Sequence, residues 1–337
     1  MATPNRTHAL PATVGDLLRL RTIGWREALE AREASILAVL VVMGIALGIA
    51  YPQFGTLDNV DNILLAVAQV AIVGVGMTMV IITGGIDVSV GSSLSVCAVI
   101  VAMRIQDGAG IPEALVVGIA VGAGIGLVNG LLIGLGRVHS IIITFGMLNL
   151  LRVVSFKLTG GKWLTGLPDT LNYFGSGTLL KLPFAWWIAM AMAAVATYYL
   201  RRRPTGRHLY ALGGNAETAR LAGVAVLKRT IFVYTITGAL VGVASLVFVG
   251  QAGQVVQTNV GYGFELDVIA AVVIGGTSIL GGKGTVIGTL LGALLVGTIR
   301  NAFVIVDINP LWADFILGAL ILLTTALDLL RRRGRET

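Results

Sequence analysis

Long apolar segments alternate with short polar ones along almost the whole chain. A hydrocarbon core about 30 Å thick is crossed by about 20 residues of helix. The pattern therefore predicts an all-α polytopic membrane protein with about ten transmembrane helices. The apolar runs lie at about 35–52, 62–83, 87–103, 113–136, 140–158, 184–200, 229–250, 266–281, 284–305 and 312–330.

Two of the longest apolar stretches contain glycine-rich interruptions. The stretch 62–103 is too long for one crossing at 1.5 Å per residue, so we expect a break near Gly84 and Gly85. The stretch 266–305 is predicted to break around Gly275–Gly284 in the same way. Each stretch is therefore expected to form two short crossings or a broken helix.

Composition agrees with a membrane protein: 56% of the 337 residues are hydrophobic and 12% are charged. Soluble proteins are about 25% charged. With the N-terminus inside, eighteen Lys and Arg residues fall on the cytoplasmic side and four outside. This bias follows the positive-inside rule and predicts that both termini are cytoplasmic. The net charge of +7 is then a signal of topology, and no nucleic-acid partner is expected.

The same reading divides the chain into three parts. Residues 1–33 are polar and have no signal-peptide pattern, so we predict a cytoplasmic tail with an interfacial helix at 14–32. Residues 34–330 form the membrane domain, which includes the polar loop 201–229. Residues 331–337 are a basic cytoplasmic tail.

Asp87 is a carboxylate close to membrane depth, which makes it a functional candidate. It also follows Gly84 and Gly85 and precedes Ser89, a setting that suits a helix N-cap. A structural cap and a role in gating or subunit contact both remain open. Cys97 is the only cysteine, so neither a disulfide nor a thiolate metal site is expected.

Glycines recur every four residues in two of the apolar runs. Such a ridge lets a neighbouring helix pack backbone to backbone. The neighbour could belong to the same subunit, or the ridge could form a subunit or pore interface. The glycines are Gly118, Gly122, Gly126, Gly130 and Gly134 in one run and Gly284, Gly288 and Gly292 in the other.

The segment Gly275–Thr285 resembles a phosphate-binding loop only superficially. A P-loop needs glycine, four residues, and then Gly-Lys-Ser/Thr. Here Thr277 occupies the first position and Gly284 follows Lys283. The chain is therefore expected to have no ATPase of its own and not to be an enzyme.

The loop 201–229 contains the pattern of a short capped helix. Asn215 suits the N-cap, Glu217 falls in the first turn, and Gly223 suits the residue after the C-cap. A helix this short is not stable alone and needs a partner surface or tethering at both ends. On the outside, the segment 159–183 is predicted either to dock an external protein or to form a short interfacial helix.

Three segments carry a resemblance to a known family. Glu217-Thr218-Ala219, followed by three residues and Gly223, resembles the Glu-Ala-Ala loop of ATP-binding-cassette importer permeases, with Thr218 in place of the middle alanine. Ile82–Ser92 looks like the first signature of the ribose/xylose/galactose-type permeases. Ala270–Ser278 with Gly281–Thr285 resembles their second signature. The resemblance covers roughly residues 35–330.

The resemblance implies the membrane-spanning permease subunit of a monosaccharide importer in the bacterial inner membrane. It implies two copies of this chain, a cytoplasmic ATPase that holds ATP and Mg²⁺, and an external sugar-binding protein; this chain itself would bind no cofactor or metal. The ATPase-coupling residues would be Asn215, Glu217, Thr218, Ala219, Arg220 and Gly223.

The translocation path is expected along the two broken segments, because irregular backbone at membrane depth is tolerated only against protein or a water-filled cavity. The residues assigned to the path or to the breaks are Gly84, Gly85, Asp87, Ser89, Gly91, Ser92, Gly275, Gly276, Thr277 and Ser278.

Two alternatives remain open. A branched-chain amino-acid permease shares the architecture. An ion-coupled secondary transporter would need buried paired acids or ion ligands. The acids other than Asp87 instead lie near the outer ends of crossings, at Glu265, Asp267, Asp307 and Asp314.

Overall fold

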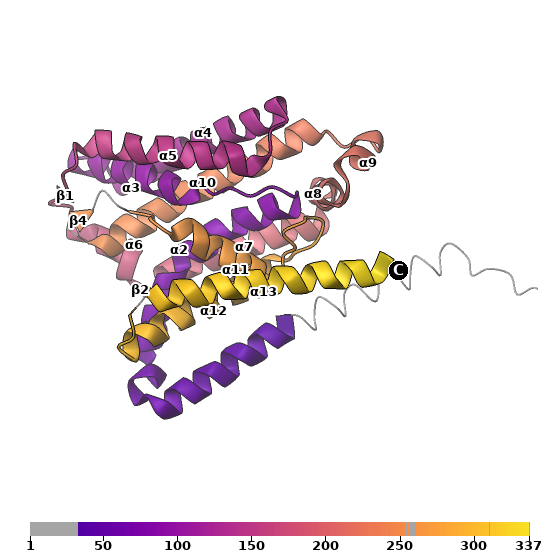
Figure 1. The fold of residues 1–337 in the computed structure, drawn as a ribbon. Coiled ribbons are helices and arrows are strands. Elements are labelled where there is room, and N and C mark those ends of the chain that lie inside the picture. Colours follow the sequence, from indigo (N-terminus) through magenta and orange to yellow (C-terminus); the bar gives the residue numbers. More distant parts are fainter. Residues whose placement is uncertain (1–32, 254, 257–259, 310, 337) are drawn as a thin grey trace, which may run out of the picture.

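The computed structural model is built almost entirely from helices (Figure 1). It describes residues 33–253, 255–256, 260–309 and 311–336. Within that part, six helices are long and apolar enough to cross a membrane. In chain order they are Glu33–Ala50, α2 (Leu57–Ile82), α4 (Ile111–Gly136), α5 (Ser140–Thr159), α10 (Val226–Ala252) and α12 (Val286–Ile305). The prediction of an all-α polytopic membrane protein is confirmed.

The remaining predicted runs also contain helices. They are α3 (Val90–Gln106), α7 (Phe184–Arg202), α11 (Phe264–Ile274) and α13 (Leu311–Glu336). Both predicted breaks are present, because α2 ends at Ile82 before α3 begins, and α11 ends at Ile274 before α12 begins. The interfacial helix expected at 14–32 lies outside the described residues.

Helix starts carry the expected local chemistry. The Thr56 hydroxyl accepts a hydrogen bond from the Asn59 amide at the start of α2, and the Thr285 hydroxyl accepts one from the Gly288 amide at the start of α12. Each bond satisfies an amide that has no partner within its helix. Pro112 lies in the first turn of α4, where a proline costs no helical hydrogen bond.

The core forms around α2, most of which is buried. Buried side chains of α3, α7, α10, α11 and α12 complete the same cluster. Alanines on α7, such as Ala185, Ala189 and Ala193, are fully or almost fully buried and allow a close approach. The helices Glu33–Ala50, α5 and α13 instead expose large apolar side chains, as expected for surfaces in contact with lipid or another subunit.

The glycine ridge of α4 packs against α10 within the same chain. A Cβ on Gly122 would collide with the Gly238 carbonyl, and one on Gly126 would collide with the Tyr234 carbonyl. In the other direction, a Cβ on Gly238 would strike the Gly122 carbonyl. The second glycine series packs α12 against α11, where Gly288 meets Gly275. Of the two interpretations, packing within one subunit is the one observed for these glycines.

The two ends of the bundle differ. At one end lie α8 (Pro204–Gly214) and α9 (Ala216–Leu221), and the C-terminal end of α13 extends toward the same side of the molecule (Figure 1). At the other end lie short strands and turns, together with the short helix α6, which packs against α10. These elements are η1 (Pro52–Gly55), β1 (Leu164–Thr165), η2 (Asp169–Leu171), α6 (Asn172–Ser176), β2 (Thr178–Leu179), β3 (Leu182–Pro183) and β4 (Val255–Val256).

The segment 159–183 thus takes part in two antiparallel strand pairs. Its strand β1 pairs with β4, which comes from a later part of the chain, and its strands β2 and β3 pair with each other. The rings of Tyr173 and Phe174 in α6 pack against Phe184 at the start of α7, with centroids 5.2 and 5.7 Å from its ring. This cluster fixes the segment to the bundle.

Candidate functional site

The short helix predicted in the polar loop is α9. The Asn215 side chain accepts a hydrogen bond of 2.8 Å from the Thr218 amide, so Asn215 is the N-cap as expected. Gly223 follows the C-cap residue with a φ of +83°, a conformation that favours glycine. The caps at both ends define a helix of one and a half turns.

The exposed face of α9 carries both charged and apolar side chains. Glu217 and Arg220 form an ion pair of 2.6 Å, and the Arg220 guanidinium holds the pKa of Glu217 below its usual range. Both side chains are exposed, so the pair adds little stability. Leu221 is 75% exposed, whereas Ala219 is buried against the rest of the protein. An exposed leucine beside an ion pair is a surface suited to protein contact.

The helix α8, which precedes α9, was not predicted. It begins at Pro204 and ends in Gly213 and Gly214. Gly213 lies against the backbone of both helix breaks, because a Cβ there would overlap the Ile82 carbonyl oxygen and come within 2.6 Å of the Gly282 amide. The sequence signal for this contact was the Gly-Gly pair itself.

The two breaks also meet each other at this point. The Gly282 amide donates a hydrogen bond of 2.8 Å to the Ile82 carbonyl. A Cβ on Gly281 would lie 2.8 Å from the Gly213 carbonyl oxygen and 2.9 Å from the Gly84 nitrogen. We call Gly84, Gly213, Gly281 and Gly282 the glycine junction. It joins the end of α2, the segment between α11 and α12, and the helix beside α9.

The first break is held by hydrogen bonds from α5. The Ser140 hydroxyl accepts from the Ile86 amide at 3.0 Å, and the Thr144 hydroxyl accepts from the Val88 amide at 3.2 Å. These contacts satisfy amides that have lost their helical partners, as buried backbone groups require. Gly85 lies against the Tyr234 hydroxyl, which leaves no room for a side chain.

Asp87 is buried and belongs to this support. One carboxylate oxygen accepts from the Ser89 amide at 2.9 Å and from the Ser89 hydroxyl at 2.6 Å. Asn129 of α4 donates to the Ser89 hydroxyl at 2.9 Å. The N-cap of α3 is Ser89. The prediction of Asp87 as the capping residue is therefore wrong by two positions, because a turn at residues 88 and 89 separates Asp87 from the start of α3. Its local role is nonetheless to hold the turn.

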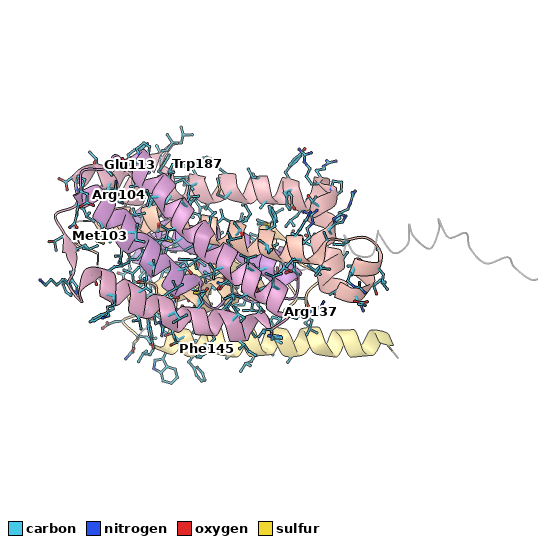
Figure 2. All side chains as sticks on the ribbon, turned by 90° about the horizontal axis from the view of Figure 1, so that it is seen from above. Met103, Arg104, Glu113, Arg137, Phe145 and Trp187 are labelled. Atoms are coloured by element: carbon cyan, nitrogen blue, oxygen red, sulfur yellow. The ribbon has the colours of Figure 1, made fainter. Side chains whose placement is uncertain are left out.

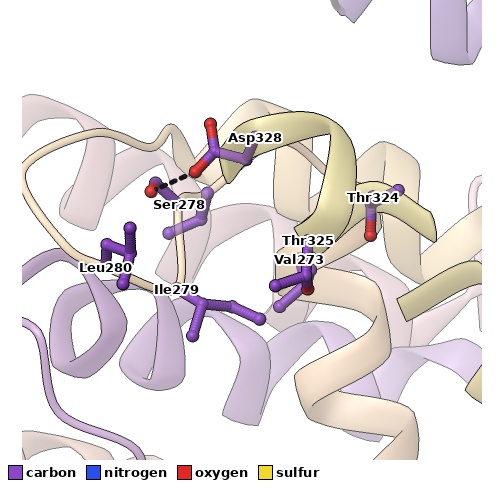
Figure 3. A pocket seen from close by; sticks show the side chains of 8 residues that line it. Val273, Ser278, Ile279, Leu280, Thr324, Thr325 and Asp328 are labelled. Carbon is purple, nitrogen blue, oxygen red and sulfur yellow. Dashed lines mark hydrogen bonds between the residues drawn. The ribbon is translucent and has the colours of Figure 1, made fainter. Parts of the chain in front are cut away.

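The second break is tied to the C-terminal helix. The Ser278 hydroxyl donates a hydrogen bond of 2.6 Å to Asp328 of α13, as Figure 3 shows. Thr277 is buried, and Gly276 and Gly281 have φ values of 103° and 81°. The Tyr210 hydroxyl of α8 donates to the Gly284 carbonyl at 3.0 Å. This break therefore contacts both α8 and α13.

Three of the four acids predicted near the outer ends of crossings, Glu265, Asp267 and Asp314, are paired with arginines. Arg300 forms ion pairs with Asp267 and, at 2.7 Å, with Asp314. Glu265 faces Arg152 at 3.5 Å. Among the described residues no three His, Cys, Asp or Glu side chains are placed to hold a metal ion. The predicted path residues divide accordingly: Gly84 lies at the glycine junction, Asp87 and Ser89 support the first break, and Gly275 packs against Gly288.

Sequence comparison assigns this architecture to a family. Residues 59–325 match a family described as branched-chain amino acid transport system, permease component. The chain belongs to this permease family. No solved structure matches the chain. The resemblance drawn from the glycine-rich segments is thereby confirmed for the family as a whole.

Curated relatives narrow the comparison within the permease family. The chain is 38% identical over 300 residues to the ribose import permease protein RbsC of Escherichia coli K12, covering 88% of this chain and 93% of the relative. Identity to the Haemophilus influenzae RbsC is 37% over 299 residues, or 88% and 92% of the two chains. The autoinducer 2 import system permease protein LsrC of an Enterobacter species is 37% identical over 304 residues, or 89% and 87%.

Proposed function

We propose that this chain is the membrane-spanning permease subunit of a bacterial ATP-binding-cassette importer for a monosaccharide, a pentose or a hexose. The observation that carries this proposal is the glycine junction, which connects the exposed helix α9 to both helix breaks through α8. The relatives are named as import permeases for ribose or for autoinducer 2, and these names support a sugar-like substrate.

The topology that fits this function has ten crossings in the inner membrane, with both termini in the cytoplasm. This topology is supported by the way charged residues are distributed between the two ends of the helix bundle. Arg104 and Glu113 lie at one end of the bundle and Arg137 at the other (Figure 2). The end with Arg137 also carries α9 and the basic residues around it. The proposed domains are then the tail 1–33, the membrane domain 34–330 and the basic tail 331–337.

The proposed partners follow from the two ends. A cytoplasmic ATPase, holding ATP and Mg²⁺, would bind α9 through Leu221, Glu217 and Arg220, since these side chains are exposed. A soluble sugar-binding protein would dock outside, over α6 and its strand pairs. A second copy of this chain would complete the path, and no cofactor is assigned to the chain itself.

Closure of the ATPase would move α9, and α8 would carry the movement to the junction. Because Gly213 lies directly on the backbone of both breaks, a shift of α8 displaces the ends of α2 and of the segment after α11 together. Close-packed backbone transmits displacement with little compliance. The breaks are the points at which the bundle can bend without loss of helical hydrogen bonds.

Reversing the charge at α9 tests this proposal. Glu217→Arg removes the acid from the first turn and breaks the ion pair with Arg220, so the ATPase should no longer copurify and uptake should stop. The permease should still reach the membrane, because Glu217 is exposed. Glu113→Arg, at the opposite end of the bundle, is the matched control and should retain ATPase binding. Normal ATPase copurification with Glu217→Arg would contradict the assignment of α9.

The energy source separates the importer from a secondary transporter. Uptake of D-ribose into cells should cease when ATP is depleted while the proton gradient is preserved. Uptake that persists would overturn the importer. A branched-chain amino-acid substrate is the second candidate, because the family description names that class. Competition of ribose uptake by L-leucine, with ATP present, would favour it.

A further inference from the structure

A cavity of about 320 Å³ lies between α3, α5 and the residues that precede α11. This volume is at the lower end of the range for small-ligand pockets, about 300–1,000 Å³. Its walls combine apolar surface with hydroxyl and guanidinium groups. The lining residues include Ser92, Ser95, Arg152, Phe156, Gly261 and Tyr262.

Arg152 is a charged residue in the middle of the apolar helix α5. It lies about 18 Å along the helix from Ser140 and about 10 Å from Thr159, so it is within the crossing. A charge at this depth is costly unless it faces protein or a water-filled cavity, and such residues mark substrate pathways. The Arg152 guanidinium lies over the Tyr262 ring, 4.7 Å from its centroid, and Glu265 approaches it at 3.5 Å. The cation Arg152 thus lines the cavity, and Glu265, buried behind the wall, balances its charge.

The cavity adjoins the first helix break. Gly91, in the first turn of α3, touches the backbone of Gly261, and a Cβ on either glycine would collide with the other residue. Ser92 follows directly and contributes to the cavity wall. A movement of the break therefore alters the shape of this cavity.

We propose that this cavity is a substrate site that holds one neutral polyhydroxylated sugar ring. Tyr262, which is 80% exposed, offers an aromatic face to the C–H face of a sugar, as aromatic rings commonly do for apolar surfaces. Arg152 donates to hydroxyl oxygens, the hydroxyls of Ser92 and Ser95 accept from hydroxyl hydrogens, and the buried Glu265 holds the Arg152 guanidinium from behind the wall.

The same chemistry disfavours other substrates. A branched aliphatic side chain would leave these polar groups unpaired, which costs more than the apolar contact returns. An anion or a cation would disturb the balanced Arg152–Glu265 pair. This inference rests on the proposed function and adds to it the residues that contact the sugar.

The first test measures uptake by the complete importer, reconstituted in vesicles with its ATPase and binding protein. The probes are D-ribose, D-xylose and D-galactose. Arg152→Met and Tyr262→Ala should each lower uptake of the transported sugar about tenfold or more, because a charge-assisted hydrogen bond or the stacking surface is lost. ATP hydrolysis stimulated by the binding protein should persist, which shows that the variants are folded and coupled.

The matched control is Tyr198→Ala on α7. Tyr198 is 57% exposed and also lies beneath an arginine, Arg203, but is outside the cavity. Its uptake should equal that of the wild type. Wild-type uptake by both cavity variants would overturn the site while leaving the importer intact. A wild-type assembly that imports none of the three sugars would overturn the proposed function first.

The second test needs no variant of a residue assigned to the sugar. Cys97, the only cysteine, is buried and can be replaced by alanine. Phe156→Cys then places a thiol on the rim of the cavity, and Tyr198→Cys places one outside it. The transported sugar should block thiosulfonate labelling at position 156 and leave position 198 unaffected. Equal labelling at position 156 with and without sugar would overturn the site.

Discussion

At the scale of single residues, the absence of a side chain at Gly213 lets α8 pack directly against both helix breaks. Gly213 and Gly214 are neighbours at the end of α8, yet only a Cβ on Gly213 would meet other backbone. We expect Gly213→Ala to separate α8 from both breaks, because its Cβ would overlap the Ile82 carbonyl. Overpacking of this kind typically costs about 1–3 kcal/mol. Transport should fall strongly, and sugar uptake by the reconstituted importer measures it.

Gly214→Ala provides the control, because a Cβ there meets nothing within 4 Å. Both substitutions change helix propensity at the end of the same helix by a similar amount. ATPase copurification should be normal in both variants, since α9 is untouched. Full uptake by Gly213→Ala would show that the contact does not carry the coupling.

At the scale of elements, the length of the apolar runs and the placement of glycines predicted both helix breaks. The helix α8, by contrast, depends on tertiary packing, which the sequence pattern does not reveal. The helix α8 was missed because its residues, with Gly206, Gly213 and Gly214 among eleven, have weak helix propensity. It forms because Leu209 and Leu212 are buried against the bundle. Tertiary contact overrides propensity in such cases.

The buried polar contacts were equally out of reach. Asp87 was recognised as significant from its setting, but its network includes Asn129, forty-two positions away. Likewise the sequence places Arg152 inside the apolar run 140–158, but its partners Tyr262 and Glu265 come from a distant segment. Pairings at such separations follow from the helix arrangement, which periodicity does not specify.

The close contact between α4 and α10 makes a prediction at this scale. Gly126→Val would drive a side chain into the Tyr234 carbonyl and separate the two helices. Membrane helices associate largely through close packing, so we expect a loss of about 2 kcal/mol or more and a lower Tm. Gly124→Val is the control on the same helix, because Gly124 is exposed and has nothing within 4 Å of its Cβ position. Thermal unfolding in detergent, followed for both proteins, compares them directly; equal Tm values would contradict the packing role.

At the scale of the whole molecule, burial decides which helices need to be apolar. In the part of the chain that the structure describes, six helices satisfy the length and hydropathy expected of a crossing, while α3, α7, α11 and α13 do not. Yet α3 is buried along most of its length and carries Ser92, Ser93 and Ser95 without contact with lipid. A helix surrounded by protein can cross a membrane with less apolar surface than one in lipid. This argument favours ten crossings over six.

The two topologies differ in where two short loops lie. With ten crossings the loop after α3 is external and the loop after α4 is cytoplasmic; with six crossings both assignments reverse. Asp107→Cys and Val138→Cys, each made with Cys97→Ala, place one thiol in each loop. In intact cells freed of their outer membrane, an impermeant maleimide should label position 107 and spare position 138 until the cells are lysed. The opposite labelling would show that α3 does not cross the membrane. The proposed sugar cavity, which α3 lines, would then not lie in a transmembrane pathway. Because both thiols flank α4, one crossing separates them in either topology, and each serves as the control for the other.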